Sequence, residues 1–243
     1  MDFALIGIPF DKSQTLRKGA AKAPAILRKV FPKLETFIFG VDLAEEAFVK
    51  YGEAENDESE IRESLNGSNN AFPIFLGGDH SITFPAASAV APEKVVIFDA
   101  HADCEDSEGH DGVTRRLVGR FGKENVFLYG IRVASKAEDK FIRENKIKII
   151  NLDGLKKLKG KIYLSVDLDV LDPSVIASVG NPEPMGKSFS EVSQAIGCLA
   201  DKLVAMDFVE FTPIKTDEMG IHALMAGKLI YGAMASMIKA KEK

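Results

Sequence analysis

Short apolar segments alternate along the chain with longer amphipathic or polar segments. Eight of the apolar segments have the length and composition of β-strands: Phe3–Ile8, Thr36–Val41, Phe72–Leu76, Val95–Asp99, Val126–Tyr129, Ile147–Ile150, Ile162–Asp167 and Leu203–Val209. Several of them, such as VVIF and LVAMDFV, are continuous apolar runs. Such runs are typical of parallel strands that are covered on both faces.

Helical patterns fill the intervals between these strands. They cover Ala23–Val30, Ser59–Leu65, Phe84–Ala91, Lys136–Asn145, Asn151–Leu158 and Ser190–Ala200, and Ser190 is the expected N-terminal cap of the last of these. The apolar stretch Gly220–Ile238 contains His222 and Lys228, so it is predicted as a largely buried helix and not as a membrane span. The alternation predicts a doubly wound parallel α/β sheet in one domain, residues 1–243.

Composition and charge narrow the class of protein. The 243 residues carry 31 basic and 36 acidic side chains, a net charge of −5, so no nucleic-acid partner is expected. The only cysteines, Cys104 and Cys198, are too few for a disulfide framework or a thiolate metal cage. The opening MDFALIGIPF lacks the basic region of a secretion signal, which predicts a cytoplasmic protein without a membrane partner.

Histidine and aspartate residues gather just after three of the predicted strands. Asp79 and His80 follow the third strand, Asp99, His101 and Asp103 follow the fourth, and Asp167 and Asp169 follow the seventh. In an open parallel sheet, ligands bind outside the carboxyl ends of the strands. A spacing of two residues also directs side chains to one face of an extended chain. These residues are therefore expected in one crevice.

A buried group of four aspartates needs cations to balance its charge. Two divalent cations would supply four positive charges, and neutral imidazoles would complete the coordination. Oxygen and imidazole ligands without thiolates favour manganese over structural zinc and leave iron, cobalt and nickel open. Asp79 is better suited to orienting a histidine ligand than to binding metal itself.

Three motifs carry a resemblance to a known family. GGDHS (77–81), DAHAD (99–103) and SVDLDVLDP (165–173) resemble the metal-binding signatures of the arginase/agmatinase ureohydrolases. The opening GIPFDKSQTLRKGAAKAPAILR, the segment VEFTP and the tail ALMAGKLIYGAM are also similar to that family. The resemblance implies a three-layer α/β/α fold around an eight-stranded parallel sheet, and a homotrimer or homohexamer.

The resemblance also implies a role for each matched residue. Two manganese ions per chain would be held by six ligands: His80, Asp99, His101, Asp103, Asp167 and Asp169. Asp103 and His110 are the candidate catalytic residues, and His110 matches the proton-shuttling histidine of the family. Glu210 matches the carboxylate that binds the guanidinium of the substrate. Two alternatives remain open, in which His110 is a loop residue and Glu210 pairs with Lys215.

The chemistry of these groups is that of a hydrolase acting on linear amidines. Two close metal ions supply hydroxide at neutral pH, a carboxylate orients the guanidinium, and an imidazole protonates the leaving amine. Agmatine, giving putrescine and urea in polyamine metabolism, is the expected substrate, because Ser135 stands where arginases hold the α-amine and NPEP (181–184) resembles an agmatinase segment. Arginase, guanidinobutyrase or formimidoylglutamase activity, or a catalytically weak metal-binding paralogue, remain as alternatives.

Overall fold

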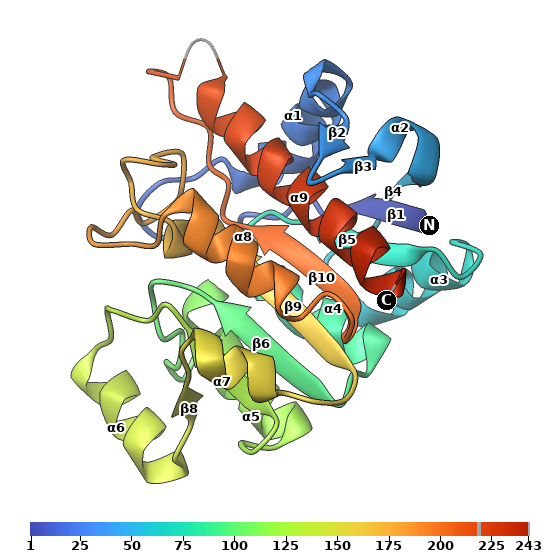
Figure 1. Cartoon of the computed structure of the whole chain (residues 1–243). Helices are drawn as coiled ribbons and strands as arrows, with labels where there is room; N and C mark the ends of the chain where they lie inside the picture. Colours follow the sequence, from blue (N-terminus) through green and yellow to red (C-terminus); the bar gives the residue numbers. More distant parts are fainter. Residues whose placement is uncertain (218–219, 243) are drawn as a thin grey trace.

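Eight parallel strands form one sheet at the centre of the computed structural model, which describes residues 1–217 and 220–242 (Figure 1). Every pair of neighbouring strands in this sheet is parallel. Across the sheet the strands are β4 (Phe48–Glu53), β1 (Asp2–Gly7), β5 (Phe72–Leu76), β10 (Leu203–Val209), β9 (Ile162–Asp167), β6 (Lys94–Phe98), β7 (Val126–Tyr129) and β8 (Lys148–Ile149).

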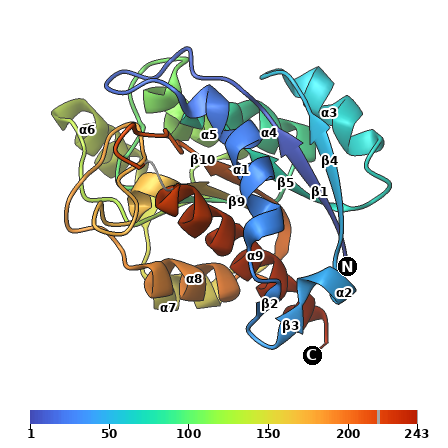
Figure 2. The same ribbon diagram turned by 90° about the horizontal axis from the view of Figure 1, so that it is seen from above.

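Helices cover both faces of the sheet, which gives three layers (Figure 2). One face is covered by α1 (Ala23–Val30), α7 (Leu152–Lys157), α8 (Phe189–Gly197) and α9 (Ile221–Lys241). The other face is covered by α3 (Glu58–Asn66), α4 (Thr83–Val90), α5 (Val113–Phe121) and α6 (Lys136–Asn145). The short helix α2 (Leu43–Glu46) follows a small ribbon that packs against α9. The predicted three-layer α/β/α fold is confirmed.

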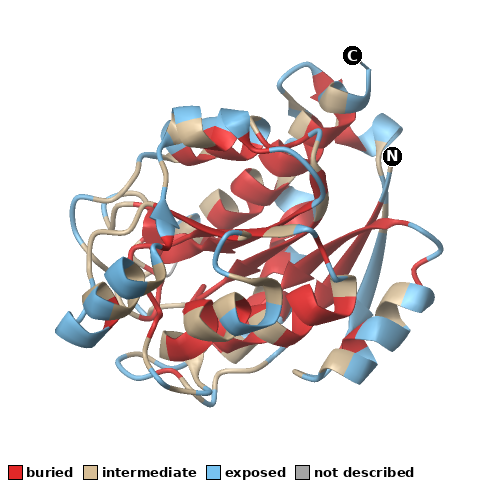
Figure 3. Cartoon of the chain, turned by 90° about the horizontal axis from the view of Figure 1, so that it is seen from below, coloured by how far each residue is buried: buried red, intermediate tan, exposed pale blue. Residues whose placement is uncertain are grey.

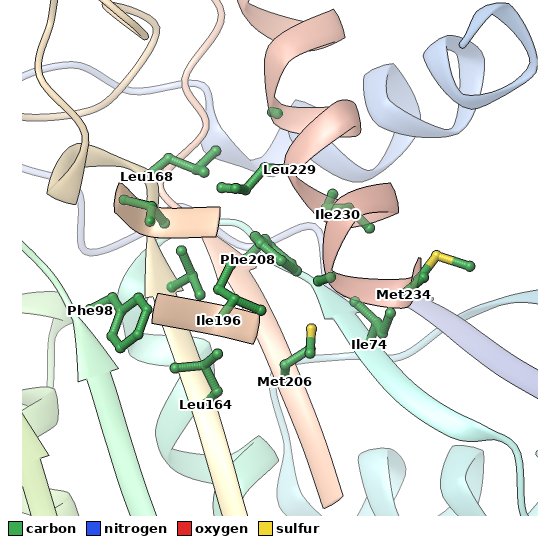
Figure 4. Packing of buried hydrophobic residues seen from close by; sticks show 14 of the residues in the cluster. Ile74, Phe98, Leu164, Leu168, Ile196, Met206, Phe208, Leu229, Ile230 and Met234 are labelled. Carbon is green, nitrogen blue, oxygen red and sulfur yellow. The ribbon is translucent and has the colours of Figure 1, made fainter. Parts of the chain in front are cut away.

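The central strands are buried on both faces, which explains their continuous apolar sequences. In β6, Val95 and Ile97 join the core under α3 to α6, whereas Val96 and Phe98 join the core on the opposite face. Figure 3 shows the buried sheet between the two helical layers. Figure 4 shows the core that contains Phe98, with Phe208 between strands and helices. Side chains alternate between the faces of a strand, so a strand with two covers needs apolar residues throughout.

The prediction of one strand over Thr36–Val41 is wrong, because this segment is not part of the central sheet. The chain there forms a separate antiparallel ribbon of β2 (Phe37–Ile38) and β3 (Val41–Asp42). Phe39 and Gly40 have φ values of 52° and 82°, the left-handed conformation that a two-residue hairpin turn requires. The edge strand beside β1 is instead β4 (FVKYGE), which is largely exposed and lacks the continuous apolar run of the buried strands.

Two helix assignments also differ from the expectation. Helix α5 (VTRRLVGRF) was not predicted, because its arginines mask a short apolar stripe. Helix α8 is capped by Ser188 and not by Ser190. The amide of Glu191 donates to Ser188 Oγ at 3.2 Å, and Glu191 Oε2 accepts from the Ser188 amide at 2.9 Å. This reciprocal pair satisfies two backbone donors that the helix leaves unpaired.

Helix α9 is the one described helix that is long and apolar enough, by length and composition alone, to cross a membrane. In the fold it packs against α1 and α8, and its side chains Leu229, Ile230 and Met234 lie in the core (Figure 4). The prediction of a largely buried helix is confirmed. Its apolar character therefore reflects its place beside the sheet.

Candidate metal centre

The residues with candidate chemistry follow four strands that are neighbours in the sheet: β5, β10, β9 and β6. Because the strands are parallel, their carboxyl ends meet at one edge. GGDHS follows β5, Glu210 follows β10, and the acidic motifs end or follow β9 and β6. Figure 1 shows these strands near the middle of the molecule. The topology therefore brings distant parts of the sequence to one place.

His80 begins a short 3-10 helix, His80–Ile82, soon after β5. The loop before it runs close to the N-terminal segment, because the Asp79 amide donates to the carbonyl oxygen of Phe10 at 2.7 Å. A Cβ atom at Gly78 would lie 1.6 Å from the same oxygen, so only glycine fits there. These contacts fix the loop and hold the His80 ring fully buried.

The His80 ring faces carboxylates through one nitrogen. Its Nδ1 atom lies 2.9 Å from Asp103 Oδ2, 3.0 Å from Asp99 Oδ2 and 3.5 Å from Asp167 Oδ2. Its Nε2 atom lies 3.0 Å from Ser165 Oγ. The Nδ1 position and the three carboxylates therefore converge on one point, where a cation can be held.

A second group of ligands adjoins the first through Asp99. His101 Nδ1 lies 2.8 Å from Asp169 Oδ2 and 3.6 Å from Asp99 Oδ1, whereas Asp99 Oδ2 faces His80. The groups His80–Asp99–Asp103 and Asp99–His101–Asp169 each place their ligand atoms within 4.8 Å of one another. Asp167, the third carboxylate near His80, completes the set, so all six predicted ligands lie together.

Burial and charge at this cluster fit a pair of divalent cations. Burial and the carboxylate of Asp99 raise the pKa of Asp103 to about 7. Burial and the carboxylate of Asp169 raise the pKa of Asp167 well above its usual value. Shifts of this kind mark crowded negative charge, which divalent cations compensate. Imidazole and carboxylate ligands without thiolate suit manganese and its first-row neighbours.

Two of the candidate residues have a left-handed backbone. The φ angles of Asp103 and Glu210 are 49° and 63°, a conformation that costs a non-glycine residue about 1–2 kcal/mol. Backbone hydrogen bonds hold both of them. The Thr114 amide donates to the Asp103 carbonyl, and the Glu210 amide donates to the Gly78 carbonyl, each at 2.9 Å. Strain of this kind gathers at functional sites.

Glu210 presents a buried carboxylate to the crevice. Its Oε1 atom accepts from the His80 amide at 2.9 Å, and its Oε2 atom accepts from Gln14 Nε2 at 2.6 Å. A Cβ at Gly180 would lie 2.6 Å from Oε2, so glycine there leaves room for the carboxylate. Burial raises the pKa of Glu210 to about 8. Among the described residues, Lys215 makes no ion pair with Glu210, which removes that alternative.

His110 begins the 3-10 helix His110–Gly112 and lines the same crevice as the ligands. Its amide donates to Ser13 Oγ at 3.0 Å, and Ser13 Oγ donates in turn to Asp79 Oδ2 at 2.7 Å. Its Nδ1 atom is buried and has no hydrogen-bond partner within the described ranges. The imidazole is thus held through its backbone, and the residue lines the crevice.

The expected role of Asp79 is wrong. This carboxylate orients no histidine ring, because its bonds go to two serines. Asp79 Oδ1 accepts from the Ser81 amide at 3.1 Å, and Oδ2 accepts from the Ser13 amide at 2.9 Å. Through Ser13, Asp79 supports the backbone of His110.

The whole crevice has a volume of about 160 Å³, and carboxylates also line its outer part. Glu105, Asp111 and Glu138 lie there, and among the described residues of the lining Arg17 is the one arginine or lysine. Arg17 Nη1 donates to a backbone carbonyl, that of Ala177, at 3.0 Å. The outer crevice therefore carries net negative charge.

Ser135, at the position where arginases hold the α-amine of the substrate, has carboxylates beside it. It caps α6, with Oγ accepting from the Glu138 amide at 3.1 Å and donating to Glu105 Oε1 at 2.6 Å. Glu105, in the loop after β6, and Glu138, in α6 itself, therefore place carboxylates beside this serine.

Sequence reasoning missed two polar residues of the site. Gln14 lies 196 positions from its partner Glu210. Glu183 Oε1 lies 3.6 Å from His101 Nε2. Gln14 belongs to the opening segment that resembles the family, and this resemblance was the one available signal.

The raised pKa values predict a pH-dependent stability. The pKa values of Asp103 and Glu210, about 7 and about 8, lie above their ordinary values of 3.8 and 4.5, so the folded state holds protons that the unfolded chain has released. Metal-free protein should therefore lose stability as the pH rises from 6 to 8. Urea unfolding with a chelator at both pH values measures this loss.

Glu210→Gln should flatten the same pH dependence, because it removes one of the groups whose pKa is raised. Excess manganese should reduce the loss, since cations compensate the deprotonated carboxylates. A metal-free protein that gains stability as the pH rises from 6 to 8 would contradict the assigned shifts.

Comparison with known proteins agrees with this geometry. The model of the Arginase family matches residues 1–236. The N(1)-aminopropylagmatine ureohydrolase of Thermococcus kodakarensis is 33% identical over 98% of this chain and 91% of its own length. The agmatinase of Pyrococcus horikoshii is 29% identical, over 95% of this chain and 90% of its own.

A solved structure extends the agreement to three dimensions. The agmatine ureohydrolase of Thermoplasma volcanium has a TM-score of 0.84 and 30% identity, covering 99% of this chain and 91% of that one. The resemblance carried by the three motifs is confirmed. The chain belongs to the arginase family, whose members are hydrolases acting on guanidino and amidino groups.

Proposed function

We propose that the protein hydrolyses agmatine to putrescine and urea at a centre of two manganese ions. The observation that carries the proposal is the convergence of two His/Asp groups, the Glu210 carboxylate and the His110 ring on one crevice. His80, Asp99 and Asp103 would hold one ion, and Asp99, His101 and Asp169 the other. Asp167, beside His80, would complete the ligand set.

The residues of the crevice divide the chemistry among them. When bound, the two cations lower the pKa of a shared water and supply hydroxide near neutral pH. Glu210, fixed by Gln14 and the His80 amide, accepts N–H groups of the guanidinium and orients its carbon. The imidazole of His110, a residue that lines the crevice, would carry the proton that the leaving amine takes. Asp103, which faces His80 and lines the crevice, is the second candidate catalytic residue.

The charge of the outer crevice supports an amine-ended substrate. Glu105, Asp111 and Glu138 attract an ammonium group and repel a carboxylate. Agmatine and aminopropylagmatine carry only cations beyond the guanidinium. Arginine adds an α-carboxylate, and 4-guanidinobutyrate ends in one. We therefore expect the carboxylate-bearing substrates to react more slowly.

A substrate panel tests this expectation. We predict the highest kcat/KM for agmatine or aminopropylagmatine, followed by arginine and then 4-guanidinobutyrate, on one manganese-loaded preparation. Asp111→Asn should lower kcat/KM for agmatine about fivefold, as expected for a charge pair of about 1 kcal/mol, and should raise it for 4-guanidinobutyrate. Asp106→Asn is the matched control, because its side chain is 93% exposed on the same loop and pairs with Arg115.

Each alternative has its own outcome in the same panel. Arginine ahead of agmatine would overturn the substrate, and 4-guanidinobutyrate ahead would keep the chemistry with a different substrate. Release of formamide from formimidoylglutamate would indicate a formimidoylglutamase. Metal binding without urea from any guanidine would indicate a catalytically weak paralogue. The trimeric or hexameric assembly and the cytoplasmic location stay predictions.

A further inference from the structure

A buried carboxylate outside the ligand set lies in the middle of the sheet. Asp207 of β10 has no exposed surface. Its Oδ1 atom accepts from Ser165 Oγ at 2.7 Å, and its Oδ2 atom accepts from Tyr163 Oη at 2.7 Å and Thr83 Oγ1 at 2.9 Å. Burial raises the pKa of Asp207, while these hydroxyl donors oppose the shift. A carboxylate in a sheet core is costly, so its presence calls for a function.

Ser165 connects this carboxylate to the metal cluster. It lies opposite Asp207 in the register of β9 and β10, and its Oγ atom lies 3.0 Å from His80 Nε2. A serine hydroxyl has one proton and two lone pairs. Since that proton is donated to Asp207, the oxygen can only accept from the His80 ring.

This arrangement determines which nitrogen of His80 is free for a cation. A neutral imidazole carries one proton, and the hydrogen bond of one nitrogen decides the state of the other. With an acceptor at Nε2, the proton belongs there. The lone pair of Nδ1 then points toward Asp99 and Asp103, the two carboxylates of its group.

We propose that Asp207 is a positioning residue, which acts through Ser165 to keep the proton of His80 on Nε2 and Nδ1 ready to bind metal. The inference rests on the proposed metal centre but not on the identity of the substrate. Asp207→Asn would reverse the effect, because an amide donor facing Ser165 lets the hydroxyl turn its proton toward Nε2. Two donors would then oppose each other, and the His80 ring would favour the wrong tautomer.

Manganese affinity gives the first test. Titration of metal-free protein with Mn²⁺ should show about 10–100-fold weaker binding at the His80 site in Asp207→Asn and in Ser165→Ala. Tyr163→Phe is the matched control, because it removes a buried hydrogen bond to the same carboxylate at Oδ2, the oxygen that Ser165 does not contact. Its affinity should stay within about twofold of wild type on the same scale.

The ring proton of His80 gives a second test that loss of stability alone would not reproduce. The chain has four histidines, so histidine labelled with ¹⁵N gives few signals. In protein loaded with diamagnetic Cd²⁺, the Nε2–H signal of His80 should be protected from exchange in wild type and Tyr163→Phe. It should lose that protection in Asp207→Asn and Ser165→Ala.

The outcomes separate this inference from the proposed function. Unchanged metal affinity and an unchanged His80 signal in Asp207→Asn would overturn the positioning role. Equal weakening by Tyr163→Phe would also overturn it, since general damage to the core would explain both variants. Wild-type protein that binds metal but hydrolyses no guanidine would overturn the proposed function alone.

Discussion

Asp99→Asn is expected to abolish tight binding of both cations, whereas Asp103→Asn and Asp169→Asn should each lose one. Asp99 contributes one oxygen to each ligand group, while Asp103 and Asp169 each belong to a single group. Metal analysis after manganese loading and desalting should therefore show the lowest metal content in Asp99→Asn and an intermediate content in the other two variants. Activity should fall at least about 10³-fold in all three, because the charge stabilisation supplied by a metal amounts to several kcal/mol.

A remote aspartate supplies the control for this series. Asp153 pairs with Lys156 on the surface, and its side chain is 74% exposed. Asp153→Asn makes the same change of charge and should keep full metal content and rate. Equal metal retention in Asp99→Asn and wild type would refute the shared carboxylate, and with it the dinuclear centre.

His110→Ala is expected to reduce kcat by about 10²–10⁴-fold with metal content intact. The His110 ring lines the crevice but belongs to neither ligand group, so its loss should remove proton transfer and leave the metals in place. Added imidazole should restore part of the rate, because the truncation leaves space at the same place.

His222→Gln is the matched control for that variant. His222 Nδ1 lies 2.7 Å from Ser178 Oγ, and the ring is not part of the crevice lining. Its replacement should leave kcat unchanged. An unchanged rate in His110→Ala would mean that solvent protonates the leaving amine and that His110 is a loop residue.

The metal cluster was predictable because its determinants are local in sequence. Acidic residues two positions apart at or just beyond the end of an apolar strand, such as Asp167 at the end of β9 and Asp169 after it, can be placed from the sequence. The placement requires only that the carboxyl ends of parallel strands lie at one edge of the sheet. Edge elements follow weaker rules. Strand β4 is largely exposed, so its sequence need not be apolar, and its pairing with β1 depends on the rest of the sheet.

Contacts between distant segments were not predictable in the same way. The bond between Gln14 and Glu210 and the link from Asp79 through Ser13 to His110 depend on how the N-terminal loop crosses the edge of the sheet. No periodicity encodes such a crossing. The wrong role for Asp79 has this cause, since a carboxylate beside a histidine in sequence need not face its ring.

The position of β10 has a consequence for the order in which the protein can form during translation. The ribosome makes this strand after every other strand described here, yet it lies between β5 and β9. Until it emerges, a nascent chain can build only two separate half-sheets, each with an open apolar edge. His80 belongs to one half and Asp99 to the other, so the ligand group His80–Asp99–Asp103 cannot form until the two halves join. Assembly of the crevice must wait for late, long-range strand pairing, which is slow and exposes the chain to aggregation.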